Sequence, residues 1–109
     1  SYLESILLNL LTNSIKYKSD SRKLKINLNC SRLDDDTVVL TFGDNGIGID
    51  LDKNRDKIFG LYQRFHDYSD SKGLGLYLVK SQVETMGGTI SIESKVNVGT
   101  TFILTFKNK

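Results

Sequence analysis

The sequence predicts an α+β fold: a two-layer α/β sandwich in which helices pack on one face of a mixed, mostly antiparallel sheet. Two observations predict this class. Apolar residues recur at helical spacing over the first 15 residues and again between residues 73 and 86. Other segments alternate apolar and polar residues with a period of two, as strands with one covered face do.

The first helix is expected over residues 2–18. The stripe expected to face the core consists of Leu3, Ile6, Leu7, Leu10, Leu11 and Ile15. A second stripe of the same helix carries Asn9, Asn13 and Lys16. These residues share one side because successive residues of a helix are rotated by about 100°.

An antiparallel hairpin is expected to follow the helix. The covered positions of its two strands are Leu24, Ile26, Leu28 and Cys30, then Val38, Leu40 and Phe42, with an acidic turn at residues 34–36 between them. Cys30 is expected to be a small core residue.

A short helix is expected within residues 52–62, and a longer one over residues 73–86. The core face of the longer helix consists of Leu76, Val79, Val83 and Met86, and Gly87-Gly88 is expected to end it. Two strands joined by a turn at residues 97–99 close the chain. Their expected covered positions are Ile90 and Ile92, then Phe102, Leu104 and Phe106.

Composition indicates one globular domain, residues 1–109, and the missing initial Met suggests a piece of a longer chain. The net charge of +2 does not indicate a nucleic-acid or membrane-surface partner. The longest apolar run, Ile6–Leu11, is interrupted by Asn9 and is too short to span a bilayer. The single cysteine cannot form an internal disulfide.

The stripe of Asn9, Asn13 and Lys16 is a candidate ligand site. Asparagine is a poor helix former, so two asparagines four residues apart in an apolar helix suggest a polar ligand. Amide oxygens suit Mg²⁺, and a lysine one turn further on suits phosphate. A merely solvated helix face explains the same pattern as well.

A second candidate is the loop Asp44-Asn45-Gly46-Ile47-Gly48-Ile49, directly after a predicted strand. Its carboxylate could accept a hydrogen bond from a planar ligand, and its glycines would let the backbone approach that ligand. The alternative is a surface Asx turn.

Two further glycine segments are weaker signals. The segment Gly73-Leu74-Gly75-Leu76 opens the second long helix, where free N–H groups favour an anion such as phosphate. The third glycine of a dinucleotide fingerprint and the phosphate-loop signature are both missing. The segment Gly99-Thr100-Thr101 is explained better by a hairpin turn.

Taken in order, these segments resemble a known family. The matching runs are residues 4–18 (ESILLNLLTNSIKYK), 44–50 (DNGIGID), 58–65 (IFGLYQRF), 72–80 (KGLGLYLVK), 87–88 (GG) and 98–102 (VGTTF). They resemble the N, G1, F, G2 and G3 boxes of the catalytic ATP-binding domain of sensor histidine kinases. That domain belongs to the GHKL superfamily, whose Bergerat fold binds ATP without a phosphate-loop lysine.

The resemblance implies roles for individual residues. Asn13 would ligate Mg²⁺, Asn9 would line the same catalytic face, and Lys16 and Tyr17 would reach phosphate and ribose. Asp44 would accept a hydrogen bond from the adenine N6 amino group, a bond worth about 1.5–3 kcal/mol.

Other positions follow from the same resemblance. Gly46 and Gly48 would leave room for adenine, Phe59 would anchor the nucleotide lid, and Arg64 would approach the γ-phosphate. The remaining residues expected in the ATP site are Ile49, Lys72, Gly73, Leu74, Gly75, Leu76 and Thr101.

The chain departs from the family pattern at several points. Ser71-Lys72 replaces the first residues of the G2 box, the lid of residues 65–72 is short, and Lys72 is expected to compensate by meeting a phosphate. Ser14 stands where alanine is usual, a change expected to be tolerated. The strand that often precedes the first helix is missing. His66 falls in the lid and is not the expected phosphoacceptor.

The implied function is transfer of the ATP γ-phosphoryl group to a histidine on a separate dimerisation domain, with a response regulator downstream. The implied location is cytoplasmic, without direct membrane contact by this domain. Fast ATP hydrolysis is not expected, because Glu4 is poorly placed to act as a general base for water. A nucleotide-responsive interaction module without phosphotransfer is the main alternative, and a serine kinase of the same fold is a third possibility.

Overall fold

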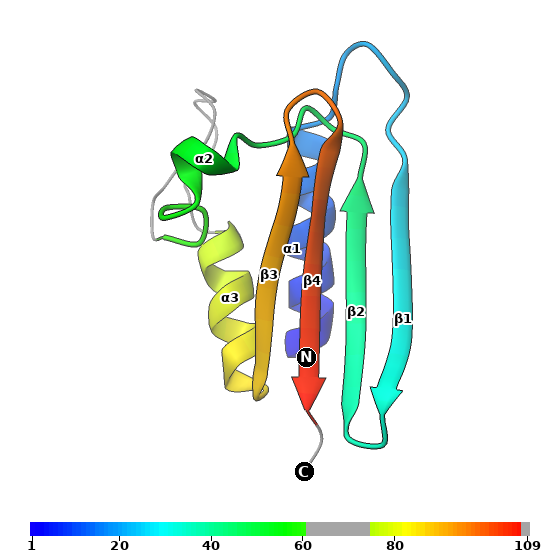
Figure 1. Ribbon diagram of the computed structural model, residues 1–109, viewed down its shortest axis with the longest axis vertical. Helices are drawn as coiled ribbons and strands as arrows, with labels where there is room; N and C mark the ends of the chain where they lie inside the picture. Colours follow the sequence, from blue (N-terminus) through cyan, green and yellow to red (C-terminus); the bar gives the residue numbers. More distant parts are fainter. Residues whose placement is uncertain (61–74, 108–109) are drawn as a thin grey trace.

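The computed structural model describes residues 1–60 and 75–107. The element order is α1 (Tyr2–Lys16), β1 (Ile26–Asp34), β2 (Thr37–Asp44), α2 (Leu51–Asn54), α3 (Gly75–Thr85), β3 (Gly88–Lys95) and β4 (Gly99–Lys107). Figure 1 shows a sheet with α1 behind it and α3 next to β3. The predicted two-layer α/β sandwich is confirmed.

The strands of the described residues form one sheet in the order β1-β2-β4-β3, and each pairing among them is antiparallel. The predicted hairpin between β1 and β2 is confirmed, with Leu28 opposite Phe42. In its turn, the Asp34 carboxylate accepts a hydrogen bond from the Asp36 N–H at 2.9 Å, and this bond lowers the pKa of Asp34.

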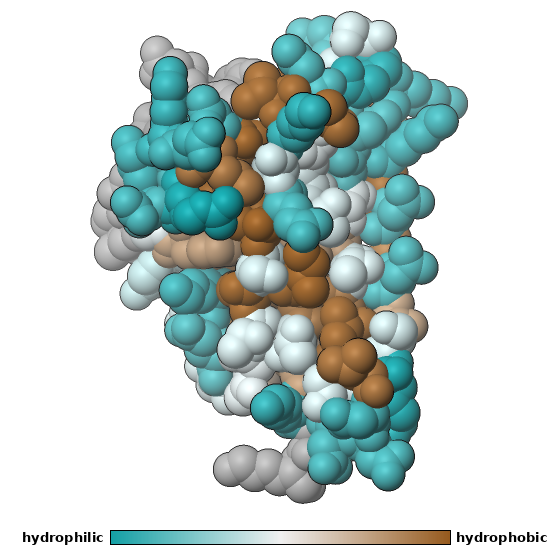
Figure 2. All heavy atoms as spheres, in the orientation of Figure 1, coloured by the Kyte–Doolittle hydropathy of each residue, from teal (hydrophilic) through white to brown (hydrophobic). Residues whose placement is uncertain are grey.

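Both long helices pack on the same face of the sheet, because one continuous core joins them to the strands. The buried apolar side chains of this core are Ile6, Leu10, Leu40, Phe42, Ile49, Ile58, Leu76, Val79, Val83, Ile92, Phe102 and Leu104. The other face carries Val39, Thr41, Ile103 and Thr105, and Figure 2 shows apolar and neutral side chains along its centre with hydrophilic ones at its edges.

The first helix is shorter than predicted and faces the core differently. It ends at Lys16, and the carbonyl of the next residue, Tyr17, accepts a hydrogen bond from the Ile47 N–H at 3.0 Å. Ile6 and Leu10 are fully buried as predicted, whereas Leu3, Leu11 and Ile15 are exposed. The predicted apolar stripe is therefore wider than the face that the sheet covers.

The expected burial of β1 is wrong. Ile26 is half-buried, but Leu28 is 51% exposed and Cys30 is also exposed, although both lie on the helix side of the sheet. Figure 1 shows the cause: β1 is an edge strand, and neither α1 nor α3 lies behind it. Alternation predicted the strand and its orientation, but it could not predict how far the helix layer extends.

The remaining helices differ from expectation at their ends. The short helix α2 spans only Leu51–Asn54, capped by Asp50, instead of lying within residues 52–62. In α3, Leu76, Val79 and Val83 are buried as predicted, but Met86 lies beyond the helix end and is 39% exposed. Gly87 has a φ of +81°, which suits a glycine after a helix end. None of the described helices is long and apolar enough to cross a membrane.

Candidate functional site

Asp44 lies at the centre of the candidate site, as the last residue of β2. Its carboxylate is half-buried and accepts two hydrogen bonds. Oδ2 accepts from the Ser14 hydroxyl of α1 at 2.7 Å, and Oδ1 accepts from the Gly46 N–H at 2.8 Å. The helix and the loop after β2 therefore fix the orientation of this carboxylate from two sides.

The hydrogen bond from the Gly46 N–H to the Asp44 side chain forms an Asx turn, the alternative explanation of this loop given above. The bond from Ser14 is additional and was not expected from the sequence. Ser14 is 1% exposed, and its buried hydroxyl donates a hydrogen bond to the Asp44 carboxylate. An Asx turn on a solvated loop would not need such a partner.

The polar stripe lies on α1, the helix that also carries Ser14. Asn9, Asn13 and Lys16 are half-buried, and Tyr17 is buried directly after them. Neither asparagine side chain makes a hydrogen bond within the part of the chain that the structure describes. The stripe is therefore not a fully solvated helix face, and its amide oxygens are available to a ligand.

The glycines of the loop are required by the chain's own packing. A Cβ at Gly46 would lie 2.6 Å from the Tyr17 carbonyl oxygen. Gly48 has a φ of +75°, and a Cβ there would overlap the Lys95 carbonyl oxygen. These contacts explain both glycines without a ligand, and the room that they would leave for adenine stays a prediction.

Backbone and side-chain hydrogen bonds join the loop after β2 to three other segments. The Ile47 N–H donates to the Tyr17 carbonyl, and the Asn97 N–H donates to the Ile47 carbonyl at 2.8 Å. The Asn45 side chain accepts from the Lys25 N–H and donates to the Lys23 carbonyl. The loop is therefore held in one shape by the end of α1, the start of β1 and the turn between β3 and β4.

Arg22 is the most connected side chain near this loop, and sequence reasoning missed it. Its guanidinium donates to the carbonyls of Asn45 and Gly46, both at 2.7 Å, and to that of Asn97 at 2.9 Å. An arginine in a polar segment gives no sequence signal for such a role, because all its acceptors are backbone atoms of distant segments.

Two other predicted residues mainly form the core. Ile49 and Leu76 are buried in it, so neither side chain presents much surface to a ligand. Gly75 opens α3 and is exposed, and no described atom outside its own helix backbone and its chain neighbours lies within 4 Å of where a Cβ would stand.

Thr101, which is predicted to line the ATP site, and Asp44 point to opposite faces of the sheet. Thr101 pairs with Gly43 and lies on the sheet face away from the helices, whereas its neighbour Thr100 pairs with Asp44 and is buried. Thr100 shares a hydrogen bond of 2.8 Å with Ser94. The alternation along β4 therefore places Thr100, and not Thr101, on the side of the Asp44 carboxylate.

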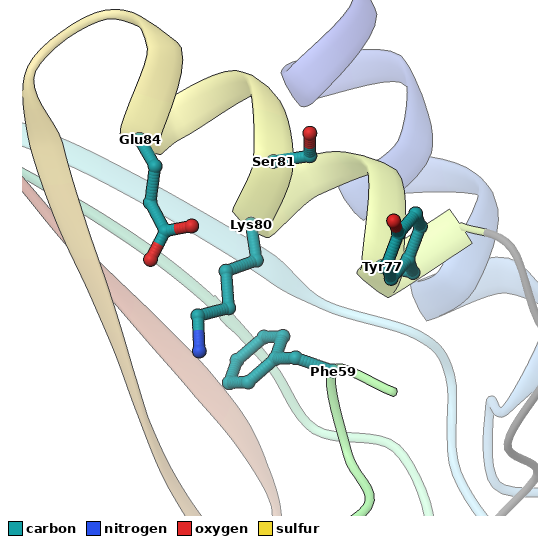
Figure 3. Close-up of a pocket in the computed structure, with 5 residues that line it drawn as sticks. All are labelled: Phe59, Tyr77, Lys80, Ser81 and Glu84. Carbon is teal, nitrogen blue, oxygen red and sulfur yellow. The ribbon is translucent and has the colours of Figure 1, made fainter. Parts of the chain in front are cut away.

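Phe59 packs between the sheet and α3. Its ring meets that of Phe102 edge-on, with centroids 6.4 Å apart, and the Lys80 ammonium lies 5.9 Å from its centroid. Figure 3 shows the open pocket of about 250 Å³ beside this ring, which is also lined by Tyr77, Ser81 and Glu84 of α3. None of these residues belongs to the α1 stripe or to the Asp44 loop.

The other predicted site residues, Arg64, Lys72, Gly73 and Leu74, lie outside the described residues. Within the described ranges, no group of three or more His, Cys, Asp or Glu side chains could hold a metal ion.

The chain is similar in sequence to known sensor proteins. The chain is 34% identical over 99 residues to the heme sensor protein HssS of Staphylococcus saprophyticus, a match that covers 91% of this chain and 21% of the relative. It is 38% identical over 103 residues to the methanogenesis regulatory histidine kinase FilI of Methanothrix harundinacea, covering 94% of this chain and 11% of FilI. It thus spans a small part of these relatives.

Solved structures show the same fold. The mycobacterial sensor histidine kinase MprB superposes with a TM-score of 0.83 at 22% identity, covering 99% of this chain and 73% of that one. Full-length ShkA in complex with AMPPNP superposes with a TM-score of 0.79 at 27% identity, covering 96% of this chain and 21% of ShkA. The family profile for histidine kinase-, DNA gyrase B- and HSP90-like ATPases matches residues 1–109. This chain therefore belongs to the family of histidine kinase-, DNA gyrase B- and HSP90-like ATPases.

Proposed function

We propose that this domain binds MgATP and donates the γ-phosphoryl group to a histidine on a separate dimerisation domain of its parent protein, from which a response regulator then receives it. The observation that carries the proposal is the Asp44 carboxylate, which the Ser14 hydroxyl of α1 and the Gly46 N–H hold in one orientation. Relatives whose names identify them as histidine kinases, and a neighbour bound to AMPPNP, support it.

Asp44 would select adenine. A fixed carboxylate accepts a hydrogen bond from an exocyclic amino group, whereas the carbonyl of guanine at the same position would meet it with repulsion. The existing bonds from Ser14 and Gly46 leave further lone pairs on both oxygens, because an ionised carboxylate has about four acceptor sites.

The α1 stripe would hold the phosphates. The Asn13 amide oxygen would ligate Mg²⁺, with Asn9 and Lys16 one helical turn to either side. When bound, the metal ion would neutralise charge on the phosphate oxygens. Lys16 would contribute a second positive charge from the last turn of the helix.

The reaction would break the bond between the γ-phosphorus and its bridging oxygen and form a phosphorus–nitrogen bond to the acceptor imidazole. ADP leaves with the bridging oxygen, and the imidazole loses a proton. The domain's contribution would be positioning and electrostatic stabilisation. The predicted roles of Arg64 and Lys72 in this step remain part of the proposal. Its dependence on ATP would place the domain in the cytoplasm.

The first test is a calorimetric titration of the chain with MgATP and with MgGTP. Asp44→Asn should abolish the preference for ATP, because an amide can also donate to a keto group. Asp36→Asn, in the exposed turn between β1 and β2, is the matched control and should bind like the wild type. Equal binding of both nucleotides by the wild type would contradict the assigned role of Asp44.

The second test separates phosphotransfer from nucleotide binding alone. The domain is mixed with MgATP labelled in the γ-phosphate and with the parent's histidine-bearing dimerisation domain. Acid-labile labelling of that histidine would support the kinase function. Binding of MgATP without labelling would instead favour the nucleotide-responsive interaction module.

A further inference from the structure

Arg22 occupies a central position between segments that are far apart in the sequence. It lies in the loop between α1 and β1, and its side chain is half-buried. Its Nε donates to the Asn45 carbonyl, and its Nη2 donates to the carbonyls of Gly46, Asn97 and Val98, the last at 3.4 Å. One guanidinium thus joins the loop after β2 to the turn between β3 and β4.

The two shorter bonds fix two consecutive peptide groups of the Asp44 loop. The peptide group between Asn45 and Gly46 presents its carbonyl to Arg22 and its N–H to Oδ1 of Asp44. The next peptide group presents its carbonyl to Arg22 and its N–H, that of Ile47, to the Tyr17 carbonyl. Because a peptide group is planar, holding the carbonyl also sets the direction of the N–H.

The geometry of these bonds requires arginine. Nε and Nη2 donate in fixed relative directions to two adjacent carbonyls, both at 2.7 Å. A lysine ammonium is a point charge on a flexible stem and cannot reproduce this fork. Arg22 also forms no salt bridge within the described part of the chain, so its charge is directed at these carbonyls.

We propose that Arg22 is a positioning residue for nucleotide binding, which orients the Asp44 carboxylate through the peptide group between Asn45 and Gly46. This inference rests on the proposed function, because Asp44 is the residue through which Arg22 would act. Arg22 itself does not touch the nucleotide.

The test compares Arg22→Met, Arg22→Lys and the control Arg32→Met. Methionine keeps an unbranched apolar side chain and removes the guanidinium. Arg32 is exposed on β1 and makes one long bond of 3.4 Å to the Asp35 carbonyl, so it matches the change in charge without touching the loop. Titration with MgATP and MgGTP, well below the unfolding temperature of each variant, gives the Kd of the folded protein.

Arg22→Met should raise the Kd for MgATP about tenfold, because a less well oriented Asp44 would lose the contribution of about one charge-assisted hydrogen bond to the nucleotide. The Kd for MgGTP should change less, so the preference for ATP should fall. Arg22→Lys should restore only part of the loss, and Arg32→Met should bind like the wild type. A merely structural role would lower the unfolding temperature and leave this preference unchanged.

Hydrogen exchange of the Gly46 amide gives a readout that needs no nucleotide. Its protection should fall in Arg22→Met and persist in Arg32→Met. If the folded wild type failed to bind MgATP, the proposed function would be overturned together with the nucleotide role of Arg22. If the wild type bound MgATP and Arg22→Met bound it equally well, the role of Arg22 alone would be overturned.

Discussion

The Ser14 hydroxyl donates a hydrogen bond of 2.7 Å to Oδ2 of Asp44, joining the first helix to the last residue of β2. The Ser14 side chain is 1% exposed, so water has almost no access to this donor. Hydrogen bonds to charged groups contribute about 1.5–3 kcal/mol, more than those between neutral groups. Ser14 therefore helps to hold the carboxylate in one orientation.

Replacing Ser14 by alanine should weaken nucleotide binding more than it weakens the fold. Asp44 would lose one of its two fixed partners, and we expect the Kd for MgATP to rise about three- to tenfold. Alanine is a better helix former than serine, which partly offsets the lost bond in the free energy of unfolding. Calorimetric titration and urea unfolding measure the two effects.

Ser5→Ala on the same helix is the matched control. It makes the same chemical change, and no hydrogen bond joins the Ser5 side chain to Asp44. It should leave the Kd unchanged. An unchanged Kd in Ser14→Ala as well would mean that Ser14 does not orient Asp44 for the nucleotide.

Cys30 provides a test of the uncovered edge of the sheet. Because its side chain is exposed, the Cys30 thiol should react with an aromatic disulfide reagent in the folded protein. The reaction rate should be within a factor of about ten of the rate for the protein unfolded in urea. Cys30→Ser should change the free energy of unfolding by less than about 0.5 kcal/mol. The colour of the released thiolate reports the rate, and strong protection in the folded state would show that β1 is covered.

The contrast between β1 and the central strands shows what the sequence could predict. Alternation placed Leu28 and Phe42 correctly on the same side of the sheet, and they are direct partners in the hairpin. Only Phe42 is buried, because helices cover the central strands and stop short of the edge. Local periodicity determines which way a side chain points, whereas its burial depends on distant elements.

The candidate site shows the same division. The sequence predicts the Asp44 loop and the asparagine stripe as candidates because their residue types are unusual where they stand. Ser14 and Arg22 were missed because their partners lie 30 residues away for Ser14 and 23 to 76 residues away for Arg22. A small residue in a helix and an arginine in a loop are common, and only the fold shows what they contact.

Phe59 should stabilise the packing of α3 beside the sheet. Phe59→Ala would remove the edge-on contact with Phe102 and the contact of the Lys80 ammonium with the ring. We expect a loss of about 1–3 kcal/mol in the free energy of unfolding, below the value for a fully buried phenylalanine because Phe59 is half-buried. Phe59→Leu should recover part of it, and Tyr77→Ala, at an exposed position on α3, should cost less.

Gly48 should tolerate no side chain. Alanine there would have to adopt a φ near +75°, and its Cβ would overlap the Lys95 carbonyl oxygen, so the turn between β3 and β4 would have to move. We expect Gly48→Ala to lower the free energy of unfolding by about 2 kcal/mol or more. Gly75→Ala is the matched control, since no described atom outside its own helix backbone and its chain neighbours lies within 4 Å of its Cβ position and alanine favours helix. It should be neutral or stabilising. Urea unfolding followed by circular dichroism measures both, and equal stability of the two variants would contradict the close approach of Gly48 to Lys95.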